Sequence, residues 1–151
     1  MNTALQTFTE NSLEDILNRG GDYDWVLDPA RAKKCMYLVC CSSQGANRKS
    51  SFLIGKVNGV EYTYTGDSGK KRYLVTISEY ASINIADSWP NKRQNPVRYA
   101  SLEELGIDLG SLNFKKVLKR TSESFTIAQA KTGLARHYGV SENSVEITIK
   151  G

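Results

Sequence analysis

The chain has 151 residues, of which 40% are hydrophobic and 24% are charged. This length fits one globular domain, or one domain with a small appendage, better than two full domains. The sequence has no apolar run of the roughly 18 to 20 residues that a membrane helix needs, and its first residues lack the basic start and apolar stretch of a secretory signal. We therefore expect a cytoplasmic protein that does not associate with a membrane.

The cysteine pattern excludes a disulfide framework. Cys35, Cys40 and Cys41 are odd in number and lie within seven residues of one another. The chain has a single histidine, His137, so a zinc site would need carboxylates or a second chain to complete four ligands. We expect a reducing compartment and no metal or other cofactor.

Charge is distributed unevenly along the chain. The first 28 residues hold six acids and one base, a net charge of −5, whereas the other 123 residues hold 19 bases and 10 acids, a net charge of +9. A basic body indicates a polyanionic partner, because each neutralised phosphate releases counterions. A solvated, lysine-rich surface is the alternative. We expect residues 1–28 to form an acidic leader.

The leader contains one helical signal, and a buried strand follows it. Ser12 can cap a helix with Asp15 in the capping-box position, and Gly20 and Gly21 end it. Residues 35–41 are apolar on both alternating faces, which is typical of a strand buried on both sides.

The sequence from residue 51 to residue 99 predicts several further short strands. Residues 51–60 are expected to form a strand that has a bulge near Gly55 and continues through Tyr62 and Tyr64. This strand is expected to pair with residues 72–78 across a turn at 66–69. Shorter extended pieces are expected through Ile83 and Ile85 and over 95–99, and Ser101 with Glu104 predicts one or two helical turns. No long helical crossover separates these strands. They predict an α+β fold, mainly an antiparallel small curved β-barrel over 29–114.

The C-terminal part of the chain predicts an appendage. Residues 115–124 are basic and polar and resemble a linker, residues 126–139 have helical periodicity, and residues 144–150 alternate as a half-buried strand. One helix and one strand cannot close a core of their own, so the helix-strand tail is expected to dock on the body or on another subunit of a homo-oligomer.

Three stretches of the body carry a family resemblance. They are the apolar strand Met36–Cys40, the stretch Ser51–Val57 with Gly55 after apolar residues, and the Arg-x-Asn-Pro-Val piece Arg93–Val97. Over about residues 34–107 this order resembles the PUA-like superfamily, the small curved barrels that include EVE, ASCH and YTH domains. The resemblance implies a pocket for a nucleotide base, an RNA element or modified DNA, enclosed by aromatic and polar side chains from loops.

The stretch from residue 89 to residue 99 is the densest candidate site. It combines rings that stack on bases, cations that contact phosphates and amides that read base edges, with no acid among them. The candidate nucleic-acid-binding residues are Trp89, Lys92, Arg93, Asn95, Arg98 and Tyr99, together with Arg48 and Lys49 from the loop between the first two strands of the body. The alternative is that the aromatic rings pack inside the fold and the charges stay in solvent.

No motif predicts an enzyme. The sequence contains no Walker phosphate loop, no dinucleotide-binding glycine fingerprint and no Gly-x-Ser-x-Gly elbow. We expect a non-catalytic protein that binds nucleic acid or a nucleotide-like ligand. The enzymatic alternative is a hydrolase or nuclease whose site has no recognisable motif. The rival hypothesis is a protein-protein interaction module or inhibitor that uses the acidic leader or the C-terminal edge strand at 145–149.

Overall fold

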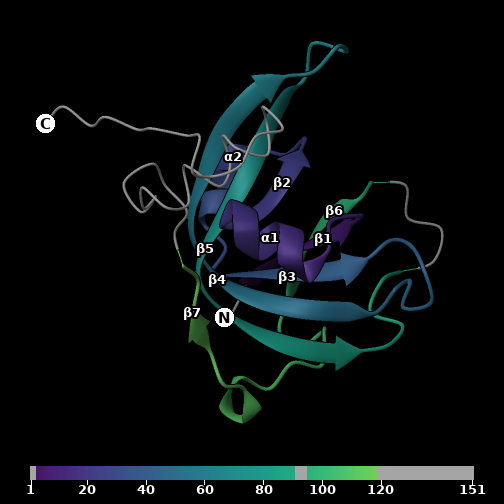
Figure 1. Cartoon of the computed structure of the whole chain (residues 1–151). Coiled ribbons are helices and arrows are strands. Elements are labelled where there is room, and N and C mark those ends of the chain that lie inside the picture. The colour runs from purple at the N-terminus through teal and green to yellow at the C-terminus, as the bar shows by residue number, and fades with distance from the viewer. Residues whose placement is uncertain (1–2, 91–94, 119–151) are drawn as a thin grey trace, which may run out of the picture. The chain divides into compact units, whose positions relative to one another are not determined.

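A computed structural model describes residues 3–90 and 95–118 (Figure 1). Met1–Leu118 form one unit with its own core. Residues 119–124 of the linker expected over 115–124, the helix expected over 126–139 and the strand expected over 144–150 lie outside the described residues. The linker was expected to begin at Lys115, but Lys115 and Lys116 form a short strand.

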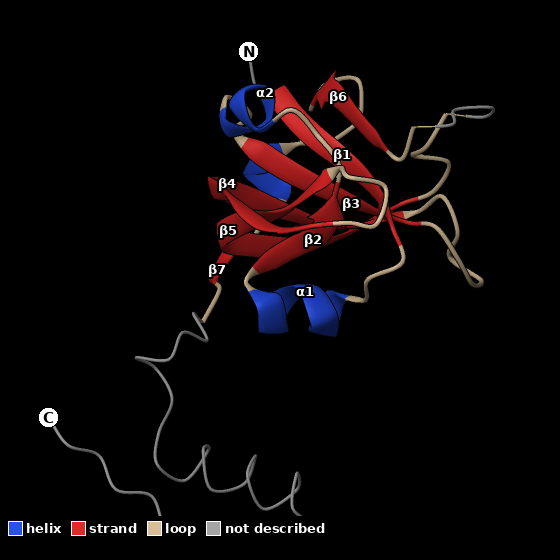
Figure 2. Ribbon diagram, turned by 90° about the horizontal axis from the view of Figure 1, so that it is seen from above, coloured by secondary structure: helices blue, strands red, loops and turns tan. Residues whose placement is uncertain are grey.

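The unit is built on one mixed sheet with few helices (Figures 1 and 2). The strands are β1 (Thr3–Thr9), β2 (Gly21–Trp25), β3 (Tyr37–Ser42), β4 (Ser51–Thr65), β5 (Lys71–Ile85), β6 (Val97–Ser101) and β7 (Lys115–Lys116). Their order is β2-β5-β4-β3-β1-β6, with β7 also beside β5. Only β1 and β3 are parallel among the pairings of the described residues. The expected α+β class is confirmed in this coarse form.

The helical content of the described residues is small. Helix α1 (Leu13–Arg19) has the expected capping box of Ser12 and Asp15, and Gly20 ends it in the left-handed conformation. The helix α2 (Pro29–Lys33) and the 3-10 turn η1 (Leu109–Ser111) were not expected from the sequence.

Residues 3–9 and 21–25 are strands of the sheet, so the first part of the chain is not a separate acidic leader. β1 lies between β3 and β6, and β2 pairs with β5. β1 was missed because its alternation is masked by polar residues: Gln6, Thr7 and Thr9 are buried, and partners far away in the sequence satisfy their hydrogen bonds.

The sheet carries a hydrophobic core on each side. On one side, called face A, Leu5, Leu38 and Leu53 pack with Ile16 of α1 and Ala32 of α2. On the other side, called face B, the buried residues of the core are Ala4, Tyr37, Val39, Ile54, Ala81, Ala100, Leu102 and Leu105. Both sides of β3 are therefore buried, as the apolar run predicted.

The sheet curls strongly without closing. Three strands separate β2 from β1 in the sheet order, yet the Thr7 hydroxyl donates to Oδ2 of Asp22 at 2.7 Å and the Thr9 hydroxyl donates to Oδ1 at 3.1 Å. β2 therefore reaches across face A to β1. Among the residues described, no ladder joins the end strands β2 and β6, so the sheet is open and a closed barrel is not formed.

Gly55 permits a close approach of β4 and β5. A Cβ atom at this position would lie 2.6 Å from Cγ2 and 2.8 Å from Cδ1 of Ile77, which is in the core of face A. The register shifts between Lys56 and Val57 and again before Gly59, so the bulge expected near Gly55 lies just after it.

We expect Gly55→Ala to lower the free energy of unfolding by about 1 to 3 kcal/mol, because the added methyl group overpacks a filled core. Urea denaturation monitored by fluorescence measures the change. Gly66→Ala is the matched control, because its Cβ would meet nothing closer than Arg72 Nε at 3.5 Å. An equal effect of the two substitutions would contradict the packing argument.

Candidate nucleic-acid interface

Two aromatic rings and two arginines lie together beside the loop after β5. The rings of Phe8 and Trp89 are stacked with their centroids 4.9 Å apart and their planes 8° from parallel. Arg48 Cζ lies 5.2 Å from the Phe8 centroid, and Arg98 Cζ lies 5.7 Å from the Trp89 centroid. We call these four residues the aromatic–arginine stack. They come from β1, the β3–β4 loop, the β5–β6 loop and β6, so only the tertiary fold brings them together.

Gln6 holds this arrangement in place from the buried side. Its amide Nε2 donates to the Ser88 carbonyl at 2.9 Å, to the Ser88 hydroxyl at 3.0 Å and to the Ser51 hydroxyl at 3.2 Å. Its Oε1 accepts from Arg98 Nε at 2.6 Å, because Gln6 and Arg98 are register partners in the β1–β6 ladder. One fully buried amide thereby anchors both the loop that carries Trp89 and the side chain of Arg98.

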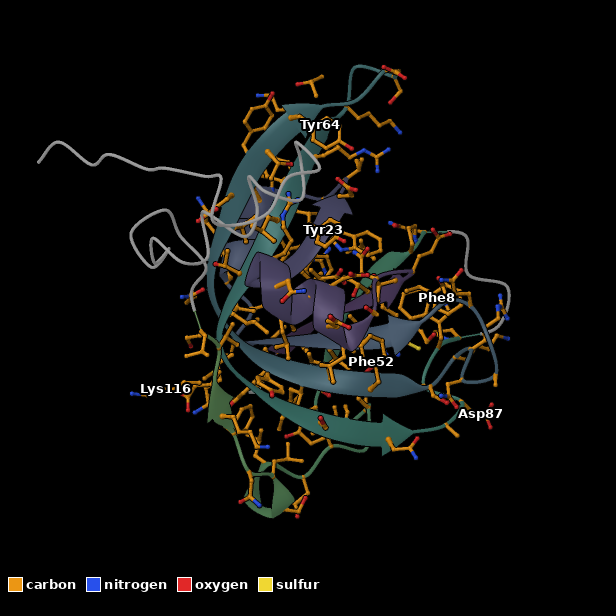
Figure 3. All side chains as sticks on the ribbon, viewed as in Figure 1. Phe8, Tyr23, Phe52, Tyr64, Asp87 and Lys116 are labelled. Atoms are coloured by element: carbon orange, nitrogen blue, oxygen red, sulfur yellow. The ribbon has the colours of Figure 1, made fainter. Side chains whose placement is uncertain are left out.

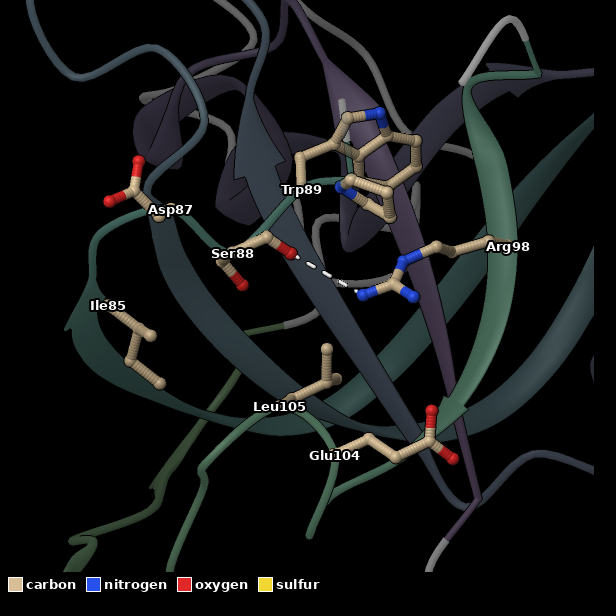
Figure 4. Close-up of a pocket in the computed structure, with 8 residues that line it drawn as sticks. Ile85, Asp87, Ser88, Trp89, Arg98, Glu104 and Leu105 are labelled. Atoms are coloured by element: carbon tan, nitrogen blue, oxygen red, sulfur yellow. Dashed lines mark hydrogen bonds between the residues drawn. The ribbon is translucent and has the colours of Figure 1, made fainter. Parts of the chain in front are cut away.

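A pocket opens next to the stack (Figure 4). Its volume is about 230 Å³, and it is lined by Ile85, Asp87, Ser88, Trp89, Pro90, Arg98, Glu104 and Leu105. Arg98 Nη2 donates to the Ser88 carbonyl at 3.5 Å, the bond drawn in Figure 4. The pocket is smaller than the roughly 300 to 1,000 Å³ typical of sites for drug-sized ligands, so it suits one small planar or anionic group. Its lining includes two acids that the sequence stretch 89–99 does not contain.

Four of the expected site residues come together here. Trp89 is only 5% exposed, because it is packed into the stack, whereas Arg48 is exposed. Arg98 is half-buried in the pocket wall. Lys49 has a left-handed backbone with φ of 70°, and its carbonyl accepts from the Ser88 amide at 2.8 Å. The β3–β4 loop and the Trp89 loop are thereby tied to each other.

The other expected site residues are placed differently. Tyr99 follows Arg98 in β6 and therefore lies on the opposite side of the sheet, where Arg31 Cζ is 3.9 Å from its ring centroid. The Asn95 side chain accepts from the Val97 amide at 3.1 Å, the contact of a local turn. Lys92 and Arg93 lie outside the described residues.

Phe8 and Gln6 were not foreseen as members of this site. Both lie in β1, a strand that the sequence pattern did not predict. Residues two apart in a strand lie on the same face, so Gln6 and Phe8 could have been placed together once β1 and its pairing with β6 were known.

A second buried polar cluster surrounds Asp22 on face A. Its carboxylate accepts from the Thr7 and Thr9 hydroxyls, from Asn11 Nδ2 at 2.8 Å, from the Tyr23 amide at 3.1 Å and from Cys40 Sγ at 3.6 Å. Burial outweighs these donors and raises the pKa of Asp22 above its usual value.

The cysteine side chains are buried. Burial raises the pKa of Cys40 well above that of a free thiol and raises the pKa of Cys41 to about 11. Both thiols are therefore protonated at neutral pH, a state in which sulfur is a weak nucleophile.

Comparisons of the chain with protein-family models, with curated proteins and with solved structures find no match. Within residues 3–90 and 95–118, no three His, Cys, Asp or Glu side chains are grouped so that they could hold a metal ion. In the same part of the chain, no helix has both the length and the apolar character needed to span a bilayer.

Proposed function

We propose that this chain is a non-catalytic, cytoplasmic PUA-like protein that binds nucleic acid or a nucleotide-like ligand at the aromatic–arginine stack. The observation that carries the proposal is the exposed guanidinium of Arg48 beside the half-buried ring of Phe8, in the group that also contains Trp89 and Arg98. Stacked rings flanked by cations are the combination with which proteins hold bases and phosphates.

The geometry of the stack limits where a base could bind. Trp89 covers one face of the Phe8 ring, so a base cannot stack between these two rings without separating them. An incoming base instead displaces the Arg48 guanidinium from Phe8 and extends the existing stack. The displaced guanidinium then pairs with a phosphate of the ligand, and Lys49 adds a second positive charge in the same loop.

The pocket beside the stack receives the adjoining part of the ligand. Arg98 supplies positive charge to its wall, and Asp87 and Glu104 supply carboxylates that can accept from base amino groups. Gln6 acts as a positioning residue, because it holds Arg98 and the Ser88 backbone at fixed places. The curled, largely antiparallel sheet supports the PUA-like part of the proposal, and the cluster of three free cysteines supports its cytoplasmic part.

Arg48→Gln tests the phosphate contact. We expect the substitution to weaken binding of labelled single-stranded RNA and DNA several-fold at about 50 mM salt, and to lower the slope of log affinity against log salt by about 1. Fluorescence anisotropy at about 50 and 200 mM salt measures both quantities.

Lys34→Gln is the matched control, because it removes one exposed positive charge at the end of α2, among residues that pack with face A. This control is expected to retain the affinity and salt slope of the wild type. The proposal fails if the wild-type protein binds no oligonucleotide, or if the Arg48 and Lys34 substitutions have equal effects.

A further inference from the structure

β4 and β5 extend into a two-stranded arm. Each strand has 15 residues, against seven in β1 and six in β3, so their paired ends continue past β1 and β3, and β2 borders the arm only at Tyr73, the partner of Trp25. We define the arm as residues 61–74, which include the turn at 66–70. Figure 1 shows it projecting from the body, and Figure 3 places Tyr64 on it, away from Phe8 and Asp87.

The arm exposes two aromatic rings. Tyr62 is 56% exposed and Tyr64 is 47% exposed. The other large hydrophobic residues exposed in the described part of the chain are Val26, Met36 and Leu118, none of which is on the arm. The exposed apolar surface of the arm is therefore aromatic and not aliphatic.

The two rings have different charged neighbours. Lys71 Nζ lies 5.9 Å from the Tyr62 ring centroid, and Arg72 is the register partner of Tyr64. Tyr62 is paired with Tyr73 and Tyr64 with Arg72, with a register shift between the two pairs. Because Arg72 and Tyr73 are consecutive residues of β5, their side chains lie on opposite faces of the hairpin. The two exposed rings, which are paired with them, therefore also lie on opposite faces. One face thus presents Tyr62 next to Lys71. On the other face, Arg72 Nη1 donates to the Asp24 carbonyl at 3.0 Å, and the Tyr64 hydroxyl is hydrogen-bonded to the Asp24 side chain.

The charge of the arm favours a polyanion. Lys70, Lys71 and Arg72 are three bases against the two acids Glu61 and Asp67, a net charge of +1. Asp67 is in the turn, whereas the three bases follow one another directly into β5.

We propose that the arm is a second contact surface for nucleic acid, which takes unpaired bases of a single strand by stacking them on Tyr62 and Tyr64. Lys70 and Lys71 contact the neighbouring phosphates. Unpaired bases offer their ring faces, whereas a duplex hides them in its own stack, so the rings select single strands. This inference rests on the proposed function and identifies the class of nucleic acid that the protein prefers.

The double substitution Tyr62→Ala with Tyr64→Ala tests the stacking. We expect it to weaken binding of single-stranded oligonucleotides about tenfold or more, and to leave the salt slope unchanged because no charge is removed. Binding of duplexes is expected to change less than about twofold. The double substitution Tyr62→Phe with Tyr64→Phe keeps the rings and is expected to bind single strands like the wild type. Near-UV circular dichroism and thermal unfolding of each variant establish that the fold is retained.

The outcomes separate the arm from the stack. If Arg48→Gln weakens binding and the alanine pair does not, the arm is not a contact surface, whereas the proposed function stands. If the alanine pair weakens binding and Arg48→Gln does not, the arm stands and the site at the stack is wrong. An equal loss on single strands and duplexes overturns the single-strand preference, and an equal loss in the phenylalanine pair overturns stacking. Absence of wild-type binding to every oligonucleotide overturns both proposals.

Discussion

Deletion of residues 1–28 is expected to abolish the cooperative unfolding of the chain. The deletion removes β1 from between β3 and β6, together with α1 and β2. β6 would then lose the only strand with which it pairs among the described residues, and the cores on both faces would lose buried side chains such as Ala4 and Leu5. Thermal unfolding followed by near-UV circular dichroism should show no sigmoidal transition.

Truncation after Leu118 is the matched control, because it removes a similar length of chain and leaves the Met1–Leu118 unit complete. This variant is expected to retain a cooperative transition. A cooperative transition in the chain that lacks residues 1–28 would contradict the role assigned to β1. It would also restore the hypothesis of a detachable acidic leader that binds a protein partner.

Asp22→Ala is expected to lower the free energy of unfolding by about 3 kcal/mol or more. The substitution leaves the buried hydroxyls of Thr7 and Thr9 and the partly buried amide of Asn11 without their acceptor, and an unsatisfied buried donor costs about 1 to 3 kcal/mol. It also removes the bridge that holds β2 across face A to β1. Urea denaturation at constant pH measures the loss.

Asp22→Asn is the matched control, because the amide keeps the volume of the side chain and one acceptor oxygen. Its loss is expected to be clearly smaller than that of the alanine variant. Equal losses would show that the hydrogen bonds to the carboxylate oxygens do not hold β2 in place.

The difference in the free energy of unfolding between the wild type and Asp22→Asn is also expected to depend on pH. Burial raises the pKa of Asp22 above its ordinary value of 3.8, so the folded protein holds this proton more tightly than the unfolded chain. The stability that Asp22 contributes is therefore fully present below the unfolded pKa and is lost as pH rises through the folded pKa. As pH rises from about 3 to 7, the free energy of unfolding of the wild type should therefore fall relative to that of Asp22→Asn. A pH-independent difference would contradict the raised pKa.

Local sequence signals predicted the middle of the fold correctly. The apolar run at 35–41 became β3, and the alternating stretches on either side of the turn at 66–69 became the β4–β5 hairpin, in which Gly69 has φ of 80°. The capping box of α1 depends on Ser12 and Asp15 alone. In each case the residues that decide the conformation are close together in sequence, so the pattern carries the information.

β1 could not be recognised in the same way. A strand with Gln6, Thr7 and Thr9 among its residues looks like a polar segment, because the partners that permit their burial are remote. Gln6 bonds to Ser88, 82 residues further along the chain, and Thr7 bonds to Asp22 on a strand across the sheet. Burial of a polar side chain depends on these partners and not on its neighbours in sequence.

Composition and charge by themselves determined that the stretch around Trp89 and Arg98 combines aromatic and cationic side chains, and that Arg48 and Lys49 form a basic loop. The tertiary structure decided which of these residues meet. Pairing of β1 with β6 places Phe8 and Gln6 beside them, and the alternation of β6 turns Tyr99 to the other side of the sheet. The sequence determines which chemical groups a segment carries, whereas their assembly into one site depends on strand order and register, which are set by contacts between segments far apart in the chain.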